Sequence, residues 1–219
     1  MKFLYKMERK FGKFAIKNLM LHITILNAIV YLASYIFQLD LIAYMALVPD
    51  LVMQGQVWRL ITYVFVPPNV SIIFTAITLY FYYFIGISLE RRWGSFKFNV
   101  YYLLGIILTA AASMIFTAAT SKISGFTIVG TYLNLSLFFA FAMLYPNMEV
   151  LFFFVIPMKI KYLAYLDAAF YAYSLIAGTP NDRIAIIGSL MNFFIFFGPD
   201  IYKMIKLKIK VMKNRSRFR

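Results

Sequence analysis

Very few side chains in this sequence combine reactivity with an apolar setting. Asp167 is a carboxylate inside a long apolar segment, and Asn134 and Asn192 are amides inside two others. An acid in such a segment is costly to bury, so Asp167 is a candidate intramembrane site. The two amides are typical of hydrogen bonds between helices. The structural alternative for Asp167 is an ion pair with Lys159 or Lys161, or a hydrogen bond from a hydroxyl group.

The amino-acid inventory excludes several kinds of site. There is no cysteine and only one histidine, His22. A disulfide framework, a cysteine-bound metal and any site that needs two imidazoles within one chain are therefore excluded. We expect no metal and no cofactor. The 24 phenylalanines and 17 tyrosines suit helix packing and membrane-interface belts, and they indicate no cofactor pocket.

The stretch from Gln54 to Gly94 organises the chain. It opens with Trp58-Arg59, passes through one apolar segment, and ends with Glu90 four residues before Gly94. Tryptophan is typical of a membrane interface. Arginine has five donors, so Arg59 can tie carbonyl groups of the connection to the bundle, or pair with an acid such as Asp40 or Asp50. Glycine permits a tight turn after the acid.

The composition predicts a membrane protein. Of the 219 residues, 63% are hydrophobic and 14% are charged, whereas soluble domains carry about 25% charged residues. The net charge of +14 is concentrated at the two ends of the chain, in residues 1–17 and 203–219. Basic residues that flank spanning segments set topology and attract anionic lipid. We therefore expect a lipid bilayer as a partner and no nucleic acid.

Six apolar segments are candidates for membrane spans. They are Leu19–Phe37, Val70–Leu89, Phe98–Ala119, Ile128–Leu144, Tyr162–Ala177 and Ile184–Tyr202. The predicted fold is an all-α bundle of six transmembrane helices. We expect residues 1–18 to form a basic amphipathic lead-in, residues 19–203 the membrane domain, and residues 204–219 a basic cytoplasmic tail.

Two connections are unusual. Residues 39–69 are too apolar for a solvated loop, and we expect short helices in the outer interface, because backbone at that depth must satisfy its own hydrogen bonds. Residues 146–161 hold an apolar run too short to cross a bilayer, bounded by Pro146 and Pro157; we expect an interfacial segment and a turn. A short loop is expected over residues 90–97.

The distribution of basic residues predicts the orientation. Six spans place both termini on one side, and most of the basic residues then lie there, which makes that side cytoplasmic. The lysine bias and the lack of a long luminal domain favour a bacterial plasma membrane.

Together these motifs make the chain resemble the rhomboid superfamily. The segment Gly55–Thr62 looks like the Trp-Arg motif of its first loop, and Gly86, Glu90 and Gly94 look like the Gly-x-x-x-Glu-x-x-x-Gly at the end of its second helix. Residues 146–162 look like the loop between its fourth and fifth helices. The resemblance covers about residues 20–203 and implies an intramembrane protease fold. More distantly, the chain resembles the Derlins, which share Trp-Arg and are not proteases.

The resemblance also implies where catalytic residues would stand. Rhomboid proteases use a Gly-x-Ser-Gly serine on the fourth helix, a histidine on the sixth, and a histidine and an asparagine on the second. Here Gly130 opens the matching segment, and Tyr132 stands at the serine. Ala185 or Ile186 stands at the histidine of the sixth helix. In the second span, Phe74 and Thr78 occupy the remaining two positions.

No other residues replace the missing pair. His22 is expected at the cytoplasmic start of the first span, out of reach of Tyr132. Without a base, the hydroxyls of Thr131, Ser136 and Ser189 are expected to bond to backbone carbonyls or neighbouring helices.

Three functions follow as alternatives. The first is a catalytically inactive rhomboid-like protein that binds transmembrane helices of client proteins, which would enter between the first loop and the fifth span. The second is an active intramembrane endopeptidase with an unconventional nucleophile. The third is a small transporter or channel that uses Asp167 and the asparagines; it predicts an internal repeat, and the sequence has none.

Overall fold

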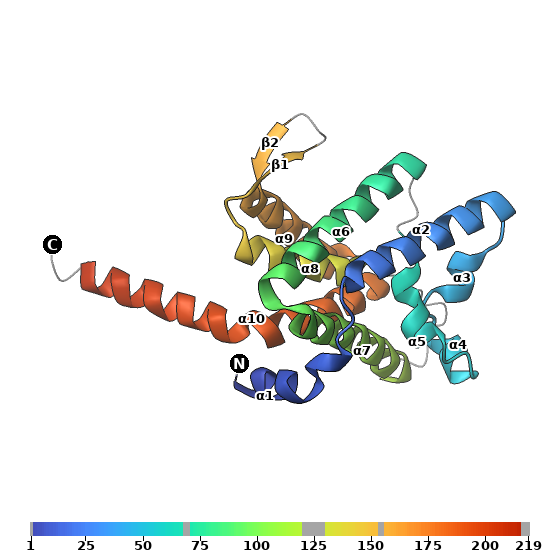
Figure 1. The fold of residues 1–219 in the computed structure, drawn as a ribbon, viewed down its shortest axis with the longest axis horizontal. Coiled ribbons are helices and arrows are strands. Elements are labelled where there is room, and N and C mark those ends of the chain that lie inside the picture. The colour runs from blue at the N-terminus through green and yellow to red at the C-terminus, as the bar shows by residue number, and fades with distance from the viewer. Residues whose placement is uncertain (1, 68–70, 120–129, 153–155, 216–219) are drawn as a thin grey trace.

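The computed structural model describes residues 2–67, 71–119, 130–152 and 156–215. Figure 1 shows a bundle of helices with short helical pieces on one flank and a small β-hairpin on another. The elements, in chain order, are α1 (Lys2–Phe11), η1 (Gly12–Phe14), α2 (Leu19–Phe37), α3 (Leu41–Met45), α4 (Pro49–Met53), α5 (Arg59–Thr62), η2 (Tyr63–Phe65), α6 (Ile72–Trp93), α7 (Ser95–Ala119), α8 (Thr131–Leu144), β1 (Glu149–Phe152), β2 (Ile156–Lys159), α9 (Ile160–Ala177) and α10 (Pro180–Arg215).

The connection between α2 and α6 is built from short helical pieces, as its apolar composition predicted. These pieces are α3, α4, α5 and η2. The Asn27 side-chain amide on α2 donates to the backbone carbonyl of Val64 in η2 over 3.1 Å, and this bond fastens the connection to the bundle. Tyr63 and Val64 are buried beside it.

Helices α6 and α7 meet at a sharp break at Gly94. The expected loop over residues 90–97 is wrong, because α6 continues to Trp93 and α7 starts at Ser95. Gly94 has φ +84°, a backbone conformation that glycine adopts without the steric penalty other residues face. The polar and basic residues that suggested a loop lie on helix ends instead.

The centre of the bundle is the contact between α7 and α10, where glycines let the two helices come close. A Cβ added to Gly188 on α10 would lie 3.0 Å from the Cα of Thr109 on α7. Gly105 on α7 faces Leu133 and Asn192 without room for a side chain. Small residues of this kind permit close helix packing in membranes.

The chain between α8 and α9 is a β-hairpin, so the all-α prediction holds for the bundle but fails here. Strands β1 and β2 are antiparallel, with Glu149 opposite Lys159 and Val150 opposite Met158. Proline disfavours helix in this stretch, while its β-branched and aromatic residues favour strands. The expected interfacial segment and turn are therefore replaced by paired strands.

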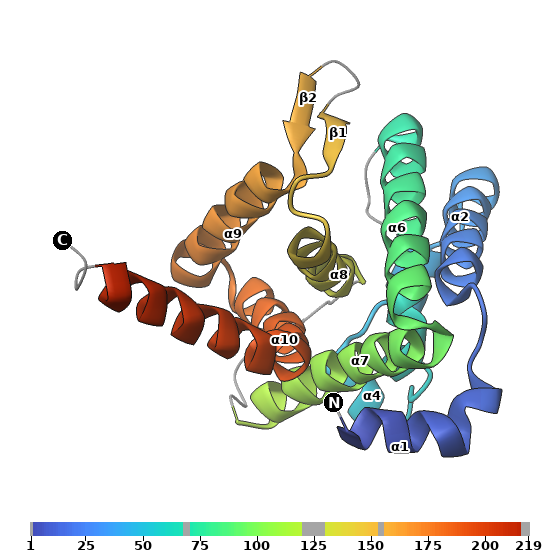
Figure 2. The same cartoon turned by 60° about the vertical axis from the view of Figure 1, so that its left-hand side comes forward.

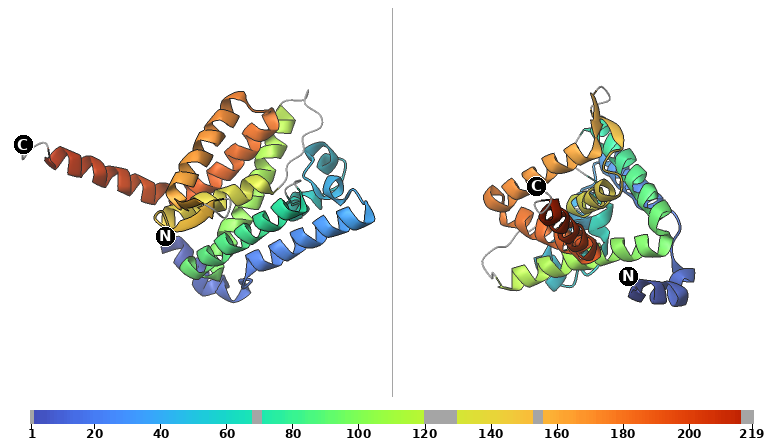
Figure 3. Two further views of the ribbon diagram at one scale, coloured as in Figure 1. Left: turned by 90° about the horizontal axis from the view of Figure 1, so that it is seen from above. Right: turned by 90° about the vertical axis from the view of Figure 1, so that its left-hand side faces the viewer.

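Helix α10 is one helix of 36 residues that contains Pro199. It starts inside the bundle and extends well beyond it through the predicted basic tail (Figures 1 and 3). The predicted sixth span and residues 204–215 of the predicted tail are thus parts of one helix.

Within the described residues, four helices are long and apolar enough to cross a membrane. They are α2, α6, α7 and the segment Asp182–Pro199 of α10. Helix α8 has 14 residues, and α9 carries Lys161, Asp167 and several tyrosines, so neither belongs to that group. The chain is a mostly helical membrane protein with four candidate spans, and the count of six stays a prediction. Four and six crossings both place the two termini on one side, and the cytoplasmic assignment of that side also stays a prediction.

Helix α8 lies between α6 and α9. It packs against both of them, while α6 also packs on α2 and α7, and α9 on α10. Figure 2 shows α8 between α6 and α9, with β1 and β2 at one end of this arrangement. This arrangement positions the candidate site.

Candidate functional site: a groove between α6 and α9

An open groove of about 590 Å3 lies between α6 and α9. Helix α8 forms part of its floor and β1 closes one end. The lining residues are Phe74, Ile77, Tyr80, Phe81, Phe84, Phe138, Val150, Leu151, Leu163, Leu166 and Asp167. Asp167 is the one charged side chain among them.

Helical periodicity explains why α6 lines one wall. Its groove residues recur at intervals of three and four, which places them on one face of the helix. Phe81 is anchored on the ring of Phe138 with 5.8 Å between ring centroids, and Phe84 packs edge-on against Phe141 at 5.7 Å. The aromatic wall is therefore fixed by α8 behind it.

Asp167 projects from α9 into this apolar groove. Its side chain is half-buried. Neither Lys159 nor Lys161 forms an ion pair with it; in the described part of the chain the salt bridge present joins Lys97 and Glu8. The Lys161 amine instead lies 5.2 Å from the centre of the Tyr162 ring. The structural alternative of a lysine pair is thus not realised.

The asparagines Asn134 on α8 and Asn192 on α10 lie deeper, against α7. The Tyr102 hydroxyl donates to Asn134 Oδ1 over 3.3 Å, and the Asn192 side-chain amide donates to the carbonyl of Tyr101 over 3.1 Å. Both are buried and link helices.

The positions that match the rhomboid catalytic residues lie on three helices, α6, α8 and α10. Phe74 lines the groove and Thr78, half-buried, does not. Ala185 and Ile186 are completely buried on α10. The backbone of Tyr132 belongs to the first turn of α8, but its side chain lies outside the described residues.

The hydroxyl groups weighed as nucleophiles are engaged elsewhere. Ser189 donates to the carbonyl of Ile186 over 2.9 Å, and Ser136 lies 3.0 Å from the Tyr101 hydroxyl. His22 is exposed on α2, and its ring nitrogen is 3.0 Å from the carbonyl of Asn18 in the same turn. The side chain of Thr131 lies outside the described residues. No imidazole lies beside a hydroxyl within the described side chains.

Arg59 fastens the first loop from within. Its guanidinium donates to the carbonyls of Ala43 at 2.6 Å and Ala46 at 2.7 Å, and to the Gln56 side chain at 2.8 Å. The side chain is 4% exposed. Of the two roles expected for this arginine, it makes the carbonyl contacts, and within the described part of the chain it forms no salt bridge.

The neighbouring Trp58 lies at the surface of the first loop. Its ring stacks on Tyr44 with 5.4 Å between centroids. It is 38% exposed, consistent with an aromatic ring at an interface.

Glu90 fastens the opposite end of α6. Its Oε1 accepts from the backbone N–H of Asn18 at 2.8 Å and from the Ser95 hydroxyl at 2.6 Å. The start of α2, the end of α6 and the start of α7 are thus joined at one buried carboxylate. One turn earlier, Gly86 leaves room for Met20, which a Cβ would strike.

Gly130 plays the same spatial role at the start of α8. A Cβ there would lie 3.1 Å from the Cα of Val64 in the first loop. The glycine therefore lets α8 begin directly against η2.

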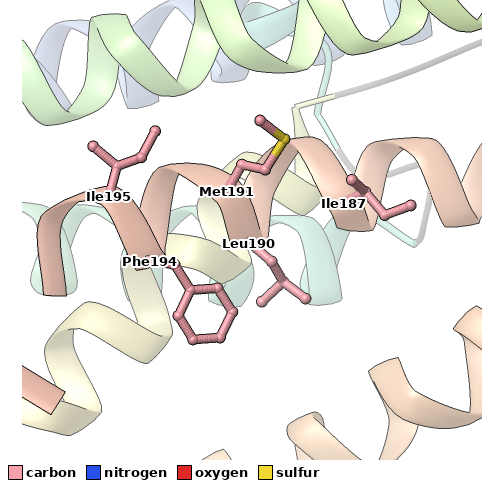
Figure 4. A pocket seen from close by; sticks show the side chains of 5 residues that line it. All are labelled: Ile187, Leu190, Met191, Phe194 and Ile195. Carbon is pink, nitrogen blue, oxygen red and sulfur yellow. The ribbon is translucent and has the colours of Figure 1, made fainter. Parts of the chain in front are cut away.

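A second hollow, of about 430 Å3, lies on α10. Figure 4 shows its lining side chains, which all come from α10 and carry no polar group: Ile187, Leu190, Met191, Phe194 and Ile195. It contrasts with the groove, which has walls on two helices and one carboxylate.

Sequence reasoning singled out Phe74 and Asp167, which both line the groove, but it missed the other lining residues and the partners of Glu90. Ile77, Phe81 and Leu166 carry no sign in the sequence that they face a groove, because lipid-facing residues are equally apolar. Asn18 and Ser95 are remote from each other in sequence, and only the fold brings them to Glu90. Within the described residues, no group of three or more histidine, cysteine or acidic side chains could hold a metal ion.

Comparison with known proteins supports the membrane class. The chain is 31% identical over 119 residues to the "Rhomboid-like protease 1" of Toxoplasma gondii, a match that covers 48% of this chain and 40% of the relative. The chain thus matches well under half of the relative's length. The more distant similarity to Derlins is not shown and stays a prediction.

A family model extends the match. The model described as "Eukaryotic integral membrane protein (DUF1751)" matches residues 19–197. A bacterial plasma membrane is therefore wrong: lysine bias reports orientation in a membrane but not the kind of cell. The multi-pass membrane nature is supported. Since this match covers most of the chain, the protein belongs to the DUF1751 family of eukaryotic integral membrane proteins, within the rhomboid-like superfamily.

Proposed function

We propose that this protein is a catalytically inactive member of the superfamily that binds transmembrane segments of other membrane proteins. The observation that carries the proposal is the position of its one imidazole. Serine-type peptide hydrolysis needs a base within about 3 Å of the nucleophile. His22 is exposed and contacts its own helical turn, while Ala185 and Ile186 are buried and apolar.

The groove supports the binding half of the proposal. An intramembrane surface lined by aromatic side chains from two helices presents a concave face to a neighbouring helix. Partner helices in membranes associate by packing and by interhelical hydrogen bonds, because lipid gives no hydrophobic driving force between them. A groove with a fixed aromatic wall and one carboxylate offers both kinds of contact.

Site-specific photo-crosslinking tests the binding. A benzophenone amino acid replaces Leu166, which lines the groove, in the full-length protein in its native membrane. The matched control places it at Ile176, an exposed position on the same helix. We expect protein adducts at position 166 that map by mass spectrometry to transmembrane segments. The same adducts at both positions, or lipid adducts alone at position 166, would contradict the proposal.

Activity-based labelling tests the loss of catalysis. The purified protein is treated with a fluorophosphonate, beside an active rhomboid protease as a positive control. We expect neither labelling nor cleavage of a transmembrane substrate. If the protein is labelled, and Ser136→Ala or Ser189→Ala abolishes the labelling, that serine is a nucleophile and the proposal is wrong.

A further inference from the structure

Asp167 is a carboxylate with no counter-ion in an apolar groove. It is half-buried, and in the described part of the chain it makes no salt bridge and no hydrogen bond. The other groove residues are aliphatic or aromatic, and among them only Tyr80 carries a polar group, its phenol hydroxyl. An intramembrane charge is expensive, and such charges are usually paired.

The depth of Asp167 favours a helix over a lipid headgroup as the source of a partner. It lies seven residues after Ile160, where α9 begins, which corresponds to about 10 Å along the helix axis. The amines of lipid headgroups lie at the membrane surface, where basic residues such as Lys159 and Lys161 at the start of α9 are also expected. A transmembrane helix can carry a cationic side chain at any depth along its length.

The dimensions of the groove fit one face of such a helix. The α6 wall runs from Phe74 to Phe84, a rise of about 15 Å along the axis. Three turns of a partner helix cover about 16 Å. The aromatic wall packs against apolar side chains of that helix, and one of its residues then faces Asp167.

We infer that the groove prefers transmembrane segments that carry a lysine or arginine opposite Asp167. This inference rests on the proposed function and specifies the client: a helix that is apolar on the face toward α6 and cationic on the face toward α9. The charge pair forms away from water, where each partner neutralises a group that otherwise lies unpaired in hydrocarbon.

The test compares matched helices in defined membranes. The full-length protein is reconstituted in phosphatidylcholine vesicles with a labelled poly-leucine transmembrane peptide, and binding is measured by fluorescence energy transfer. The peptides differ at one central position, which holds lysine, leucine or glutamate. We expect the lysine peptide to bind about tenfold more tightly than the leucine peptide, and the glutamate peptide to bind most weakly.

Variants of the protein assign the preference to Asp167. Asp167→Asn keeps the shape and removes the charge, so it should bind the lysine and leucine peptides alike. Asp167→Glu should retain the preference, and Asp167→Lys should reverse it toward the glutamate peptide. Glu149→Gln removes an exposed carboxylate that does not line the groove, and should leave the preference unchanged.

The outcomes separate this inference from the proposed function. If the lysine and leucine peptides bind equally to the unaltered protein, and the groove-filling Ile77→Trp weakens both, the binding function stands and the charge preference is wrong. If no peptide binds, both fall. If phosphatidylethanolamine displaces the lysine peptide from the unaltered protein but not from Asp167→Asn, the groove holds a lipid amine and the inference is overturned.

Discussion

The first loop and the groove between α6 and α9 are both irregular parts of a helical bundle, and they treat their polar groups in opposite ways. In the first loop, the guanidinium of Arg59 lies against three acceptors and is almost fully buried. In the groove, the carboxylate of Asp167 faces an apolar cavity and has no ion-pair or hydrogen-bond partner among the described residues. The difference separates a charge that holds the fold together from a charge left available for another molecule.

The same contrast holds between two carboxylates on the helices that flank α8, Glu90 on α6 and Asp167 on α9. Glu90 accepts two hydrogen bonds and joins three helices, while Asp167 joins none. Stability should therefore depend strongly on Arg59 and Glu90 and hardly at all on Asp167. Five substitutions compare these contributions to stability. For each one, the free energy of unfolding is measured in mixed detergent micelles.

Arg59→Ala should cause the largest loss, about 3–5 kcal/mol, because it leaves the buried carbonyls of Ala43 and Ala46 without donors. Lysine is the matched control: Arg59→Lys keeps the charge but lacks the forked geometry, so it should recover only part of the loss. If Arg59→Ala lowers the free energy of unfolding by less than about 1 kcal/mol, the contacts of Arg59 do not stabilise the fold.

Glu90→Ala should cost about 2–3 kcal/mol, since the Asn18 amide and the Ser95 hydroxyl lose their acceptor. Glu90→Gln keeps an oxygen acceptor and should lose about half as much. Equal losses for both variants would show that the negative charge, and not the hydrogen bonds, fastens these helices.

Gly188→Ala should cost about 1–2 kcal/mol, because the new methyl group meets the Thr109 backbone at 3.0 Å and forces α7 and α10 apart. Gly198→Ala, where a Cβ would meet nothing within 4 Å, is the control on the same helix. A stabilising effect at position 188 would mean that the two helices can separate without loss.

Asp167→Asn should leave stability unchanged or raise it by about 0.5–1 kcal/mol, because it removes an unpaired charge from an apolar surrounding. The measurement repeats the unfolding titration on the Asp167→Asn protein beside Glu90→Gln. A loss similar to that of Glu90→Gln would indicate that Asp167 has a structural partner, which would remove the contrast between the two carboxylates.

Met191→Leu in the second hollow should have the smallest effect, within about 0.5 kcal/mol, because the substitution conserves volume on an exposed apolar surface. It should also leave the preference for the lysine peptide unchanged. A change in peptide binding at this position would mean that the α10 hollow, and not the groove, receives the helix.

The sequence predicted the features whose physical cause is local. Composition and long apolar runs predicted helices in a membrane. The helical pieces of the first loop were predicted because backbone groups in an apolar interface must form hydrogen bonds with one another. The turn at Gly94 followed from its residue type. The predicted loop around it was wrong because a run of polar and basic residues is typical of helix ends as well as of loops.

Features that depend on distant contacts were not predictable. The hairpin needed strands to pair across a turn, and the groove needed α6 and α9 to be held apart by α8. A phenylalanine such as Phe74 reads the same in sequence whether it faces lipid or a groove. Asp167 was visible in the sequence, because a carboxylate among apolar residues is conspicuous, but its lack of a partner was not.

Helix α10 has a mechanical consequence. The helix that holds Asn192 and Gly188 against α7 continues without interruption to Arg215, and Pro199 lies between its two parts. From Pro199 to Arg215 it extends about 24 Å past the bundle. A partner that binds this lysine-rich end and moves it would therefore act, through one continuous helix, on the close contact between Gly188 and Thr109.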